Sequence, residues 1–504
     1  MGELLSSKEN AMKFKLNKYS IALIVILAAG LFLRVYKARM YLPYGHDNDL
    51  EGWVIKDILV NGHFRLIGQE TSTRGIFIGS LYYYLLIPFY LLTGLDPVGA
   101  ILLSVVLGMF GIWSFYFVFK TVFKKQEIGL TAALISAVSY ASVMNDRGSV
   151  PTMPVVIWTV WYFYAIAGIF SRKYTKSFVL LGILVSLIWH LNVALVLLTL
   201  LIPISLLINH WRFNLKQASL GIVTFFLTSI PFFVFELRHN FIQVRAVVLS
   251  FTTSQGSQLS LLEQFKRVLH MSSQIITNIF WYPSQKLNFV LPLLLFIALF
   301  FLVVKKKLSK ALAAVLFVWS ALPVVFFSFY SKQVSEYYLN GMVIVWIVLL
   351  ALSLYYLLAS KKYKLIGFLI LAFFILANLF KFFTYKDSRQ GYIYRKALVA
   401  DIKKDAQEYD YACIAISYIT SPGYDLGYRY LFWLENMHVN RPSLDRPVYT
   451  IVFPLNDTLF PVHKTFGSLG LIYPDYKRYT KDKVTEGCSG QNSNLTDPMF
   501  GYTE

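Results

Sequence analysis

Charged residues are scarce in this 504-residue sequence: they make up only 15% of the chain, whereas 57% of the residues are hydrophobic. A soluble domain usually carries about 25% charged residues, so this chain lacks the side chains needed to cover a water-facing surface. Acidic residues are especially few, with 27 Asp and Glu against 47 Lys and Arg. Because the basic residues form short clusters between apolar runs, as in membrane proteins, we do not expect nucleic-acid binding.

Cysteine and nucleotide-binding motifs are also scarce. The sequence contains no zinc-ligand spacing, P-loop or dinucleotide fingerprint, which argues against ATP-driven work by this chain. Its two cysteines, Cys413 and Cys488, lie near the C-terminal end and either form a disulfide or remain unrelated thiols. No small-residue cleavage site follows the first apolar run at 21–33, so we interpret that run as an uncleaved span.

The basic clusters constrain the topology, because clusters on the same cytoplasmic side must be separated by an even number of crossings. This constraint predicts about eleven membrane-spanning helices and makes the apolar stretch 76–93 interfacial or re-entrant. The clusters begin at Lys13, Lys120, Arg172, Arg212, Lys305 and Lys361. The expected spans are 20–37, 97–119, 127–144, 152–170, two within 178–208 that divide at 190–192, 218–235, 288–304, 311–329, 339–358 and 365–380.

The fold class that follows is mainly α: a polytopic transmembrane helix bundle with interfacial helices and a small external α/β domain. Residues 1–384 would form the transmembrane domain, with 38–96 as its first external loop. Residues 385–504 would form the external domain. Its expected elements are a polar helix at 391–408, strands at 411–417 and 448–453, and a short helix at 428–437. Another amphipathic helix is expected around 258–280.

The segment HDNDLEGW at 46–53 places three carboxylates just outside the first span. One interpretation is structural: Asp47 or Asp49 caps a helix that carries Glu51 in its first turn and lies in the membrane interface. The other is catalytic, because Asp47 and Glu51 stand four residues apart and can project from one helical face. One carboxylate would then act as a general base, while its neighbours help bind a divalent cation such as Mg²⁺ or Mn²⁺.

The order of motifs after the first span resembles the GT-C superfamily of polyprenyl-phosphate-sugar-dependent glycosyltransferases. The branch it resembles contains bacterial protein O-mannosyltransferases and lipid A aminoarabinose transferases. The motifs are the acidic cluster, an interfacial helix ending at Asn61-Gly62, the segment LIGQETST at 66–73 and the Tyr-rich segment GIFIGSLYYYLL at 75–86. The layout is similar over 20–380, and the specific motifs cover about 40–90. The sequence departs from the family at 78–80, where a Pro or His usually precedes the Tyr run.

The resemblance implies which acidic residues form the site. Asp47 falls at the place of the essential Asp that acts as base or positions the acceptor, and Glu51 matches a second acidic position. Asp49 is an additional carboxylate, so the assignment of the base between Asp47 and Asp49 stays open. Asp146 matches an acidic residue at the end of a later span and would share a metal ion with Asp47. Taken alone, Asp146 and Arg147 would be a solvated turn or a local ion pair.

The resemblance also implies contacts to the donor. A basic residue before the Tyr-rich helix contacts the donor phosphate in the family, and Arg74 is the candidate here; alone, it would anchor a phospholipid headgroup. Tyr82 and Tyr83 of that helix are assigned to substrate binding with it.

Polar residues at other span ends are further substrate-binding candidates. His190 and the nearby Asn192 either satisfy exposed backbone groups in a tight turn or line the donor cavity. Lys332, Glu336 and Tyr337 either anchor a span end in the membrane interface or contact the substrate phosphate.

The sequence therefore predicts an inverting glycosyltransferase in the plasma (inner) membrane, with a cytoplasmic N-terminus and an extracytoplasmic C-terminal domain. Its expected partners are a polyprenyl-phosphate-linked sugar, a protein, lipid or cell-envelope glycan acceptor, and membrane lipids. One alternative is a transporter or flippase of lipid-linked glycans, which predicts charged residues in mid-membrane and repeats with broken helices. Another is a non-catalytic sensor or assembly protein, in which Asp47 could be replaced without loss of function.

Overall fold

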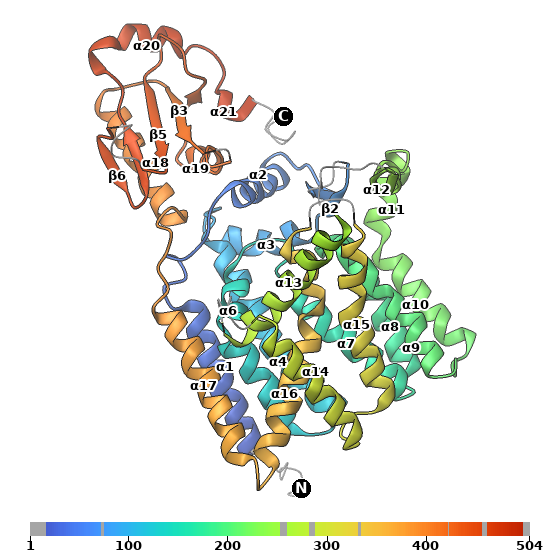
Figure 1. Cartoon of the computed structure of the whole chain (residues 1–504). Helices are drawn as coiled ribbons and strands as arrows, with labels where there is room; N and C mark the ends of the chain where they lie inside the picture. Colours follow the sequence, from blue (N-terminus) through green and yellow to red (C-terminus); the bar gives the residue numbers. More distant parts are fainter. Residues whose placement is uncertain are drawn as a thin grey trace, which may run out of the picture.

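The computed structural model describes residues 17–71, 75–252, 260–281, 288–330, 334–421, 423–455 and 461–496. A bundle of apolar helices carries a small α/β unit above one of its ends (Figure 1). Two predicted site residues, Arg74 and Lys332, lie outside the described residues.

Within the described ranges, six helices are long and apolar enough to cross a membrane. They are α1 (Lys18–Val35), α4 (Gly99–Phe123), α8 (Tyr174–Leu191), α15 (Lys310–Ser328), η2 (Glu336–Met342) continued by α16 (Val343–Ala359), and α17 (Lys364–Phe383). Two bent pairs raise the number to eight: α5 (Gln126–Val138) with α6 (Tyr140–Arg147), and α10 (Leu215–Thr228) with α11 (Ile230–Arg238). Shorter apolar helices are α3 (Leu81–Leu92), α7 (Val155–Phe170), η1 (Val193–Leu200) with α9 (Leu201–Ile208), and α14 (Val290–Val304). The chain is an integral membrane protein, and the total of eleven spans stays a prediction.

The break predicted at 190–192 is present. Helix α8 ends at Leu191, and the side chain of Asn192 accepts a hydrogen bond from the Ala194 N–H to cap η1. The helix predicted near 258–280 is α13 (Leu261–Phe280), and its apolar face packs into the main core through Val268 and Ile276.

The stretch predicted to be one span at 127–144 is bent by 63° between α5 and α6. At the bend, Asn378 of α17 accepts a hydrogen bond from the Tyr140 N–H at 2.7 Å, and the Ser139 hydroxyl donates to the Ile279 carbonyl at 2.8 Å. These bonds from other helices satisfy polar groups at the bend, which lipid would leave unpaired.

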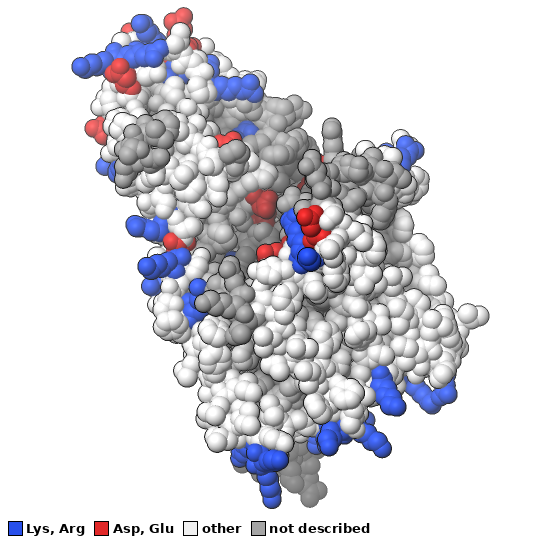
Figure 2. All heavy atoms as spheres, viewed as in Figure 1, with Lys and Arg blue, Asp and Glu red and all other residues white. Residues whose placement is uncertain are grey.

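The basic clusters that begin at Lys120, Arg172, Arg212, Lys305 and Lys361 lie at helix ends on one side of the bundle (Figure 2), as the positive-inside pattern requires. The Tyr19 hydroxyl donates to Glu127 at 2.6 Å and joins the start of α1 to the start of α5. The Lys307 ammonium lies 5.3 Å from the centroid of the Tyr356 ring, which joins the α14–α15 turn to the end of α16. Figure 2 shows lysine and arginine side chains along this lower end.

The loop after α1 contains α2 (His46–Val60) and a hairpin of β1 (Ile67–Glu70) and β2 (Phe77–Gly79). Helix α3, which follows the hairpin, has only 12 residues, as suits the interfacial or re-entrant role predicted for 76–93. Near the hairpin, α12 (Ile242–Thr252) contributes Gln243, whose side chain accepts a hydrogen bond from the Phe77 N–H at 2.9 Å.

The C-terminal α/β unit contains a five-stranded mixed sheet in the order β4-β3-β5-β7-β6. Its strands are β3 (Ile414–Thr420), β4 (Val439–Asn440), β5 (Val448–Phe453), β6 (Lys464–Phe466) and β7 (Leu469–Ile472). Its helices are α18 (Tyr392–Glu408), α19 (Arg429–Leu434), η3 (Tyr476–Arg478), α20 (Lys481–Gly487) and α21 (Ser493–Thr496). Parallel pairing joins β3 to β4 and β5, and antiparallel pairing adds β7 and β6. The predicted α/β class of this unit is confirmed, although β4, β6 and β7 were not predicted.

A disulfide joins Cys413 and Cys488, which resolves the alternative that the sequence left open. It closes a loop with a sequence separation of 75 residues. Loop-closure entropy predicts that breaking it lowers the free energy of unfolding of the unit by about 4.5 kcal/mol. We expect reductant to lower the unfolding temperature of the purified protein, measured by a thermal scan in detergent. A Cys413→Ala/Cys488→Ala protein should unfold at that lower temperature with or without reductant. If reductant lowered the unfolding temperature of this double variant further, the assignment of the effect to this disulfide would be wrong.

Candidate functional site

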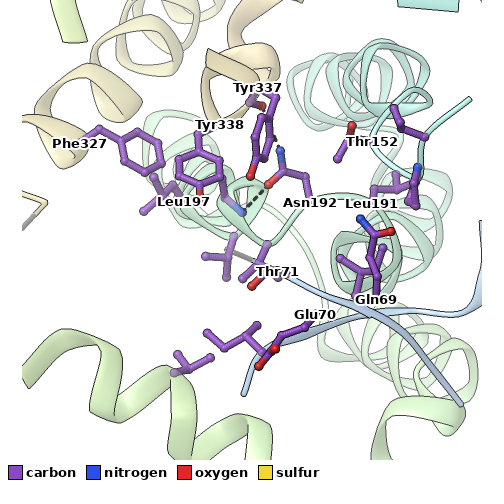
Figure 3. A pocket seen from close by; sticks show the side chains of 18 of the residues that line it. Gln69, Glu70, Thr71, Thr152, Leu191, Asn192, Leu197, Phe327, Tyr337 and Tyr338 are labelled. Atoms are coloured by element: carbon purple, nitrogen blue, oxygen red, sulfur yellow. Dashed lines mark hydrogen bonds between the residues drawn. The ribbon is translucent and has the colours of Figure 1, made fainter. Parts of the chain in front are cut away.

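A cavity of about 450 Å³ opens between the β1–β2 hairpin, the break between α8 and η1, and the neighbouring ends of α15 and η2 (Figure 3). It lies at the C-terminal ends of α8 and α15, and the opposite ends of both helices carry basic clusters. Most of its wall is aliphatic or aromatic. The polar side chains that line it are Asp47, Gln69, Glu70, Thr71, Thr152 and Asn192. The cavity thus joins an apolar wall to a polar edge on one side of the bundle.

Asn192 joins two walls of this cavity. Its side-chain NH₂ donates to the Tyr337 carbonyl at 3.0 Å, while its oxygen accepts from the Ala194 N–H (Figure 3). The same residue therefore caps η1, fixes the start of η2 and lines the cavity.

Helix α2 separates the three predicted carboxylates. Asp47 lies in the first helical turn, is exposed and lines the cavity. Asp49 and Glu51 have 0% exposed area and are not among the cavity-lining residues. Only Asp47 of the three therefore combines a free approach from solvent with a place at the cavity.

Asp49 faces the C-terminal unit. Its Oδ1 accepts a hydrogen bond from the Tyr430 N–H at 3.0 Å and lies 3.4 Å from the Tyr44 hydroxyl, which donates to it. Burial raises the pKa of Asp49 to about 7, although the Tyr430 N–H and the charges of Arg429 and Arg395 act in the opposite direction. Asp49 is thus a contact between two parts of the chain.

This raised pKa predicts a pH-dependent stability. The folded protein binds the Asp49 proton more tightly than the unfolded chain, so the free energy of unfolding should fall as the pH rises from about 4 to about 7. The full shift corresponds to an upper bound of about 4 kcal/mol. Asp49→Asn keeps the acceptor for Tyr430 but cannot ionise, so its unfolding temperature, relative to wild type, should be higher at pH 8 than at pH 5. If the unfolding temperatures of wild type and Asp49→Asn changed with pH in parallel, the pH dependence would not come from Asp49.

Glu51 lies in a buried polar network. Its Oε2 accepts from the Ser149 hydroxyl at 3.1 Å, and the Ser149 Oγ lies 3.2 Å from the Tyr82 hydroxyl. Burial raises the pKa of Glu51 well above its usual range, and the nearby charge of Asp47 raises it further. Glu51 therefore supports α2 by accepting the hydrogen bond from the Ser149 hydroxyl.

The other substrate-binding candidates are divided between core and cavity. Tyr82 and Tyr83 are buried in apolar clusters with residues of α2, and neither lines the cavity. His190 is buried, and its Nδ1 accepts a hydrogen bond from the Leu81 N–H at 3.3 Å, which attaches the start of α3 to the end of α8. Tyr337 lines the cavity, and its neighbour Glu336 is exposed.

Asp146, the second predicted metal ligand, is paired with Arg34 of α1. The Arg34 Nη2 lies 2.5 Å from the Asp146 Oδ2, and Nε donates to the same oxygen at 2.9 Å. Asp146 is not among the residues that line the cavity, whereas Asp47 is. No group of three or more His, Cys, Asp or Glu side chains in the described ranges could hold a metal ion. These residues do not fit a divalent cation shared by Asp47 and Asp146.

Several cavity residues were not identified as candidates from the sequence. Glu70 and Thr71 belong to the quoted segment 66–73, so the motif contained them without showing that they face the cavity. Thr152 lies in the turn between α6 and α7, and Phe327 lies near the end of α15. Such residues carry no local pattern that separates cavity lining from ordinary packing.

No protein-family model and no curated protein sequence matches the chain. Among solved structures it is similar to ArnT from Cupriavidus metallidurans bound to undecaprenyl phosphate, with a TM-score of 0.57 at 12% identity, over 91% of this chain and 98% of ArnT. It is also similar to the apo oligosaccharyltransferase of Archaeoglobus fulgidus, with a TM-score of 0.51 at 13% identity, over 87% of this chain and 70% of that protein. The chain therefore has the fold of these two proteins, in agreement with the resemblance found in its sequence.

Proposed function

We propose that the chain is an inverting GT-C-type glycosyltransferase that moves a sugar from a polyprenyl-phosphate donor to a protein, lipid or cell-envelope glycan. The observation that carries this proposal is the exposed carboxylate of Asp47 at a cavity with a largely apolar wall. A lipid-linked donor needs both features, because its tail requires apolar surface and its reacting sugar requires a base nearby. The similar ArnT structure contains undecaprenyl phosphate.

In the proposed reaction, Asp47 takes the proton of the acceptor hydroxyl. The acceptor oxygen then forms a bond to the anomeric carbon as the bond from that carbon to the donor phosphate breaks, which inverts the configuration. We propose Asp47 as the base in preference to Asp49, because Asp49 is buried against Tyr430. The departing phosphate needs positive charge, and we propose Arg74 and Lys332 for this role.

The placement of these two basic residues rests on the sequence. Arg74 stands between the cavity residues Thr71 and Ile76, and Lys332 follows the cavity residue Tyr330. We further propose that Glu336 and Tyr337 contact the substrate near the start of η2. No step is routed through Mg²⁺ or Mn²⁺, because the carboxylate of Asp146 is paired with Arg34.

The membrane orientation is part of the proposal. The basic helix ends would face the cytoplasm, which places the cavity and the C-terminal unit on the outer face of the plasma (inner) membrane. The disulfide between Cys413 and Cys488 supports this side, since disulfides persist in oxidising compartments.

The test is a transfer assay with the purified protein in liposomes. A panel of labelled polyprenyl-phosphate sugars is supplied with a cell-envelope extract as acceptor source, with and without a chelator. We expect label to move from one donor to the acceptor fraction with release of polyprenyl phosphate. Movement of intact donor across the bilayer without sugar transfer would favour the flippase instead. A loss of sugar transfer in the presence of chelator would support the predicted requirement for a divalent cation.

A further inference from the structure

The C-terminal unit rests on the helix that carries Asp47. The ring of Tyr430 in α19 lies against Gly52 of α2 so closely that a Cβ at Gly52 would lie 2.6 Å from it. The Trp53 ring centroid lies 6.0 Å from that of Tyr430 and 6.2 Å from that of Trp433. With the hydrogen bond from the Tyr430 N–H to Asp49, these contacts cover the first two turns of α2 on the side that Asp47 does not occupy.

Three further contacts hold the unit on the same loop. The Tyr430 hydroxyl donates to the Leu95 carbonyl at 2.7 Å. Asp96 forms an ion pair with Lys396 and accepts a hydrogen bond from the Tyr392 hydroxyl, both of α18. The loop is therefore bound to the unit at both ends, through α2 and through the segment before α4.

Helix α19 is itself braced from within the unit. Asn494, which is 4% exposed, accepts from the Arg429 Nε at 3.1 Å and donates to the Arg429 carbonyl at 3.0 Å. The segment that carries Asn494 follows Cys488, which the disulfide joins to the start of β3. This bracing limits how far α19 can move relative to the sheet.

The described residues that line the cavity all lie between Asp47 and Tyr338, so α19 reaches the cavity through α2 and not directly. We propose that α19 is a positioning element: its contacts with Asp49, Gly52 and Trp53 set the rotation of α2 and thereby hold the Asp47 carboxylate at the cavity. This inference rests on the proposed function in taking Asp47 as the base. Asp49, Gly52 and Tyr430 act through Asp47 and do not touch the reacting atoms.

Gly52→Ala in the full-length protein tests the proposal, because the added methyl group moves α19 from α2 without changing a polar atom. Gly490→Ala is the matched control, since a Cβ there meets nothing within 4 Å. We expect Gly52→Ala to lower kcat at least tenfold with the KM for donor within twofold, and Gly490→Ala to change neither. The reactivity of an Asp47→Cys thiol toward a membrane-impermeant thiol reagent should change severalfold with Gly52→Ala and stay constant with Gly490→Ala.

The thiol readout needs no enzymatic activity, so it separates this inference from the proposed function. If wild type transfers no sugar but Gly52→Ala still alters the labelling of the Asp47→Cys variant, the function fails and the positioning stands. In a Gly52→Ala/Tyr430→Leu double variant, the smaller side chain at position 430 should accommodate the added methyl group. The labelling rate of the Asp47→Cys thiol in that background, and kcat where transfer is measurable, should then return toward the wild-type values. Unchanged labelling and kcat in both Gly52→Ala and Tyr430→Ala would overturn the inference. The inference would also be overturned if the Gly52→Ala protein unfolds and adding Tyr430→Leu does not restore its fold.

Discussion

Asp47→Asn should slow sugar transfer by about a thousandfold, the range expected when a general base is removed. This loss corresponds to about 4 kcal/mol of transition-state stabilisation. Asn has the shape of Asp but cannot take the acceptor proton, so the KM for the lipid donor should change little. The measurement is a single-turnover rate at saturating donor in liposomes, together with the KM for donor.

Two neighbouring carboxylates provide matched controls on the same helix. Asp49→Asn keeps the acceptor for the Tyr430 N–H, and Glu51→Gln keeps an acceptor for the Ser149 hydroxyl. Both variants should retain transfer within tenfold of wild type at pH 7. If Asp49→Asn lowered the rate of sugar transfer more than Asp47→Asn does, Asp49 would be the base. Full activity of all three variants would favour a non-catalytic assembly protein.

The bundle was predictable because each helix leaves a local trace in the sequence. Apolar runs bounded by basic clusters give the helices, and the polar residues at 190–192 interrupt a run too long for one span, so the end of α8 at Leu191 could be predicted. The bend between α5 and α6 could not be predicted in this way. It is satisfied by Asn378, which lies 238 residues along the chain from Tyr140.

The candidate site was predictable only in part, for the same physical reason. The spacing of Asp47, Asp49 and Glu51 does not show which of them is buried, because the burial of Asp49 depends on Tyr430, 381 residues away. The Tyr-rich motif showed that α3 matters, whereas the structure directs Tyr82 and Tyr83 into the core beneath α2. Motifs thus identify the segments of this site, and long-range packing assigns the individual side chains.

Arg34→Met should be among the most destabilising single substitutions in the bundle. Besides its two bonds to Asp146, the Arg34 guanidinium donates to the carbonyls of Gly30, Ser136 and Ala137 at 3.1–3.3 Å. Arg34 is 1% exposed and Asp146 16%, so removing the arginine leaves a largely desolvated carboxylate without its cation. Breaking a buried pair in this way costs about 3–5 kcal/mol. The measurement is the unfolding temperature in detergent and the yield of folded protein.

The double variant Arg34→Met/Asp146→Leu separates a structural ion pair from a metal ligand. If Asp146 serves only to pair with Arg34, removing both charges should recover most of the lost stability, because apolar replacement of a buried pair is often neutral. Transfer activity should return with the fold, since Asp146 does not line the cavity. If Asp146 instead binds a divalent cation, Asp146→Asn alone should leave the unfolding temperature near wild type and lose activity that added Mg²⁺ or Mn²⁺ partly restores. The ion-pair geometry predicts the first result, because the hydrogen bonds from the Arg34 Nε and Nη2 end on the same carboxylate oxygen.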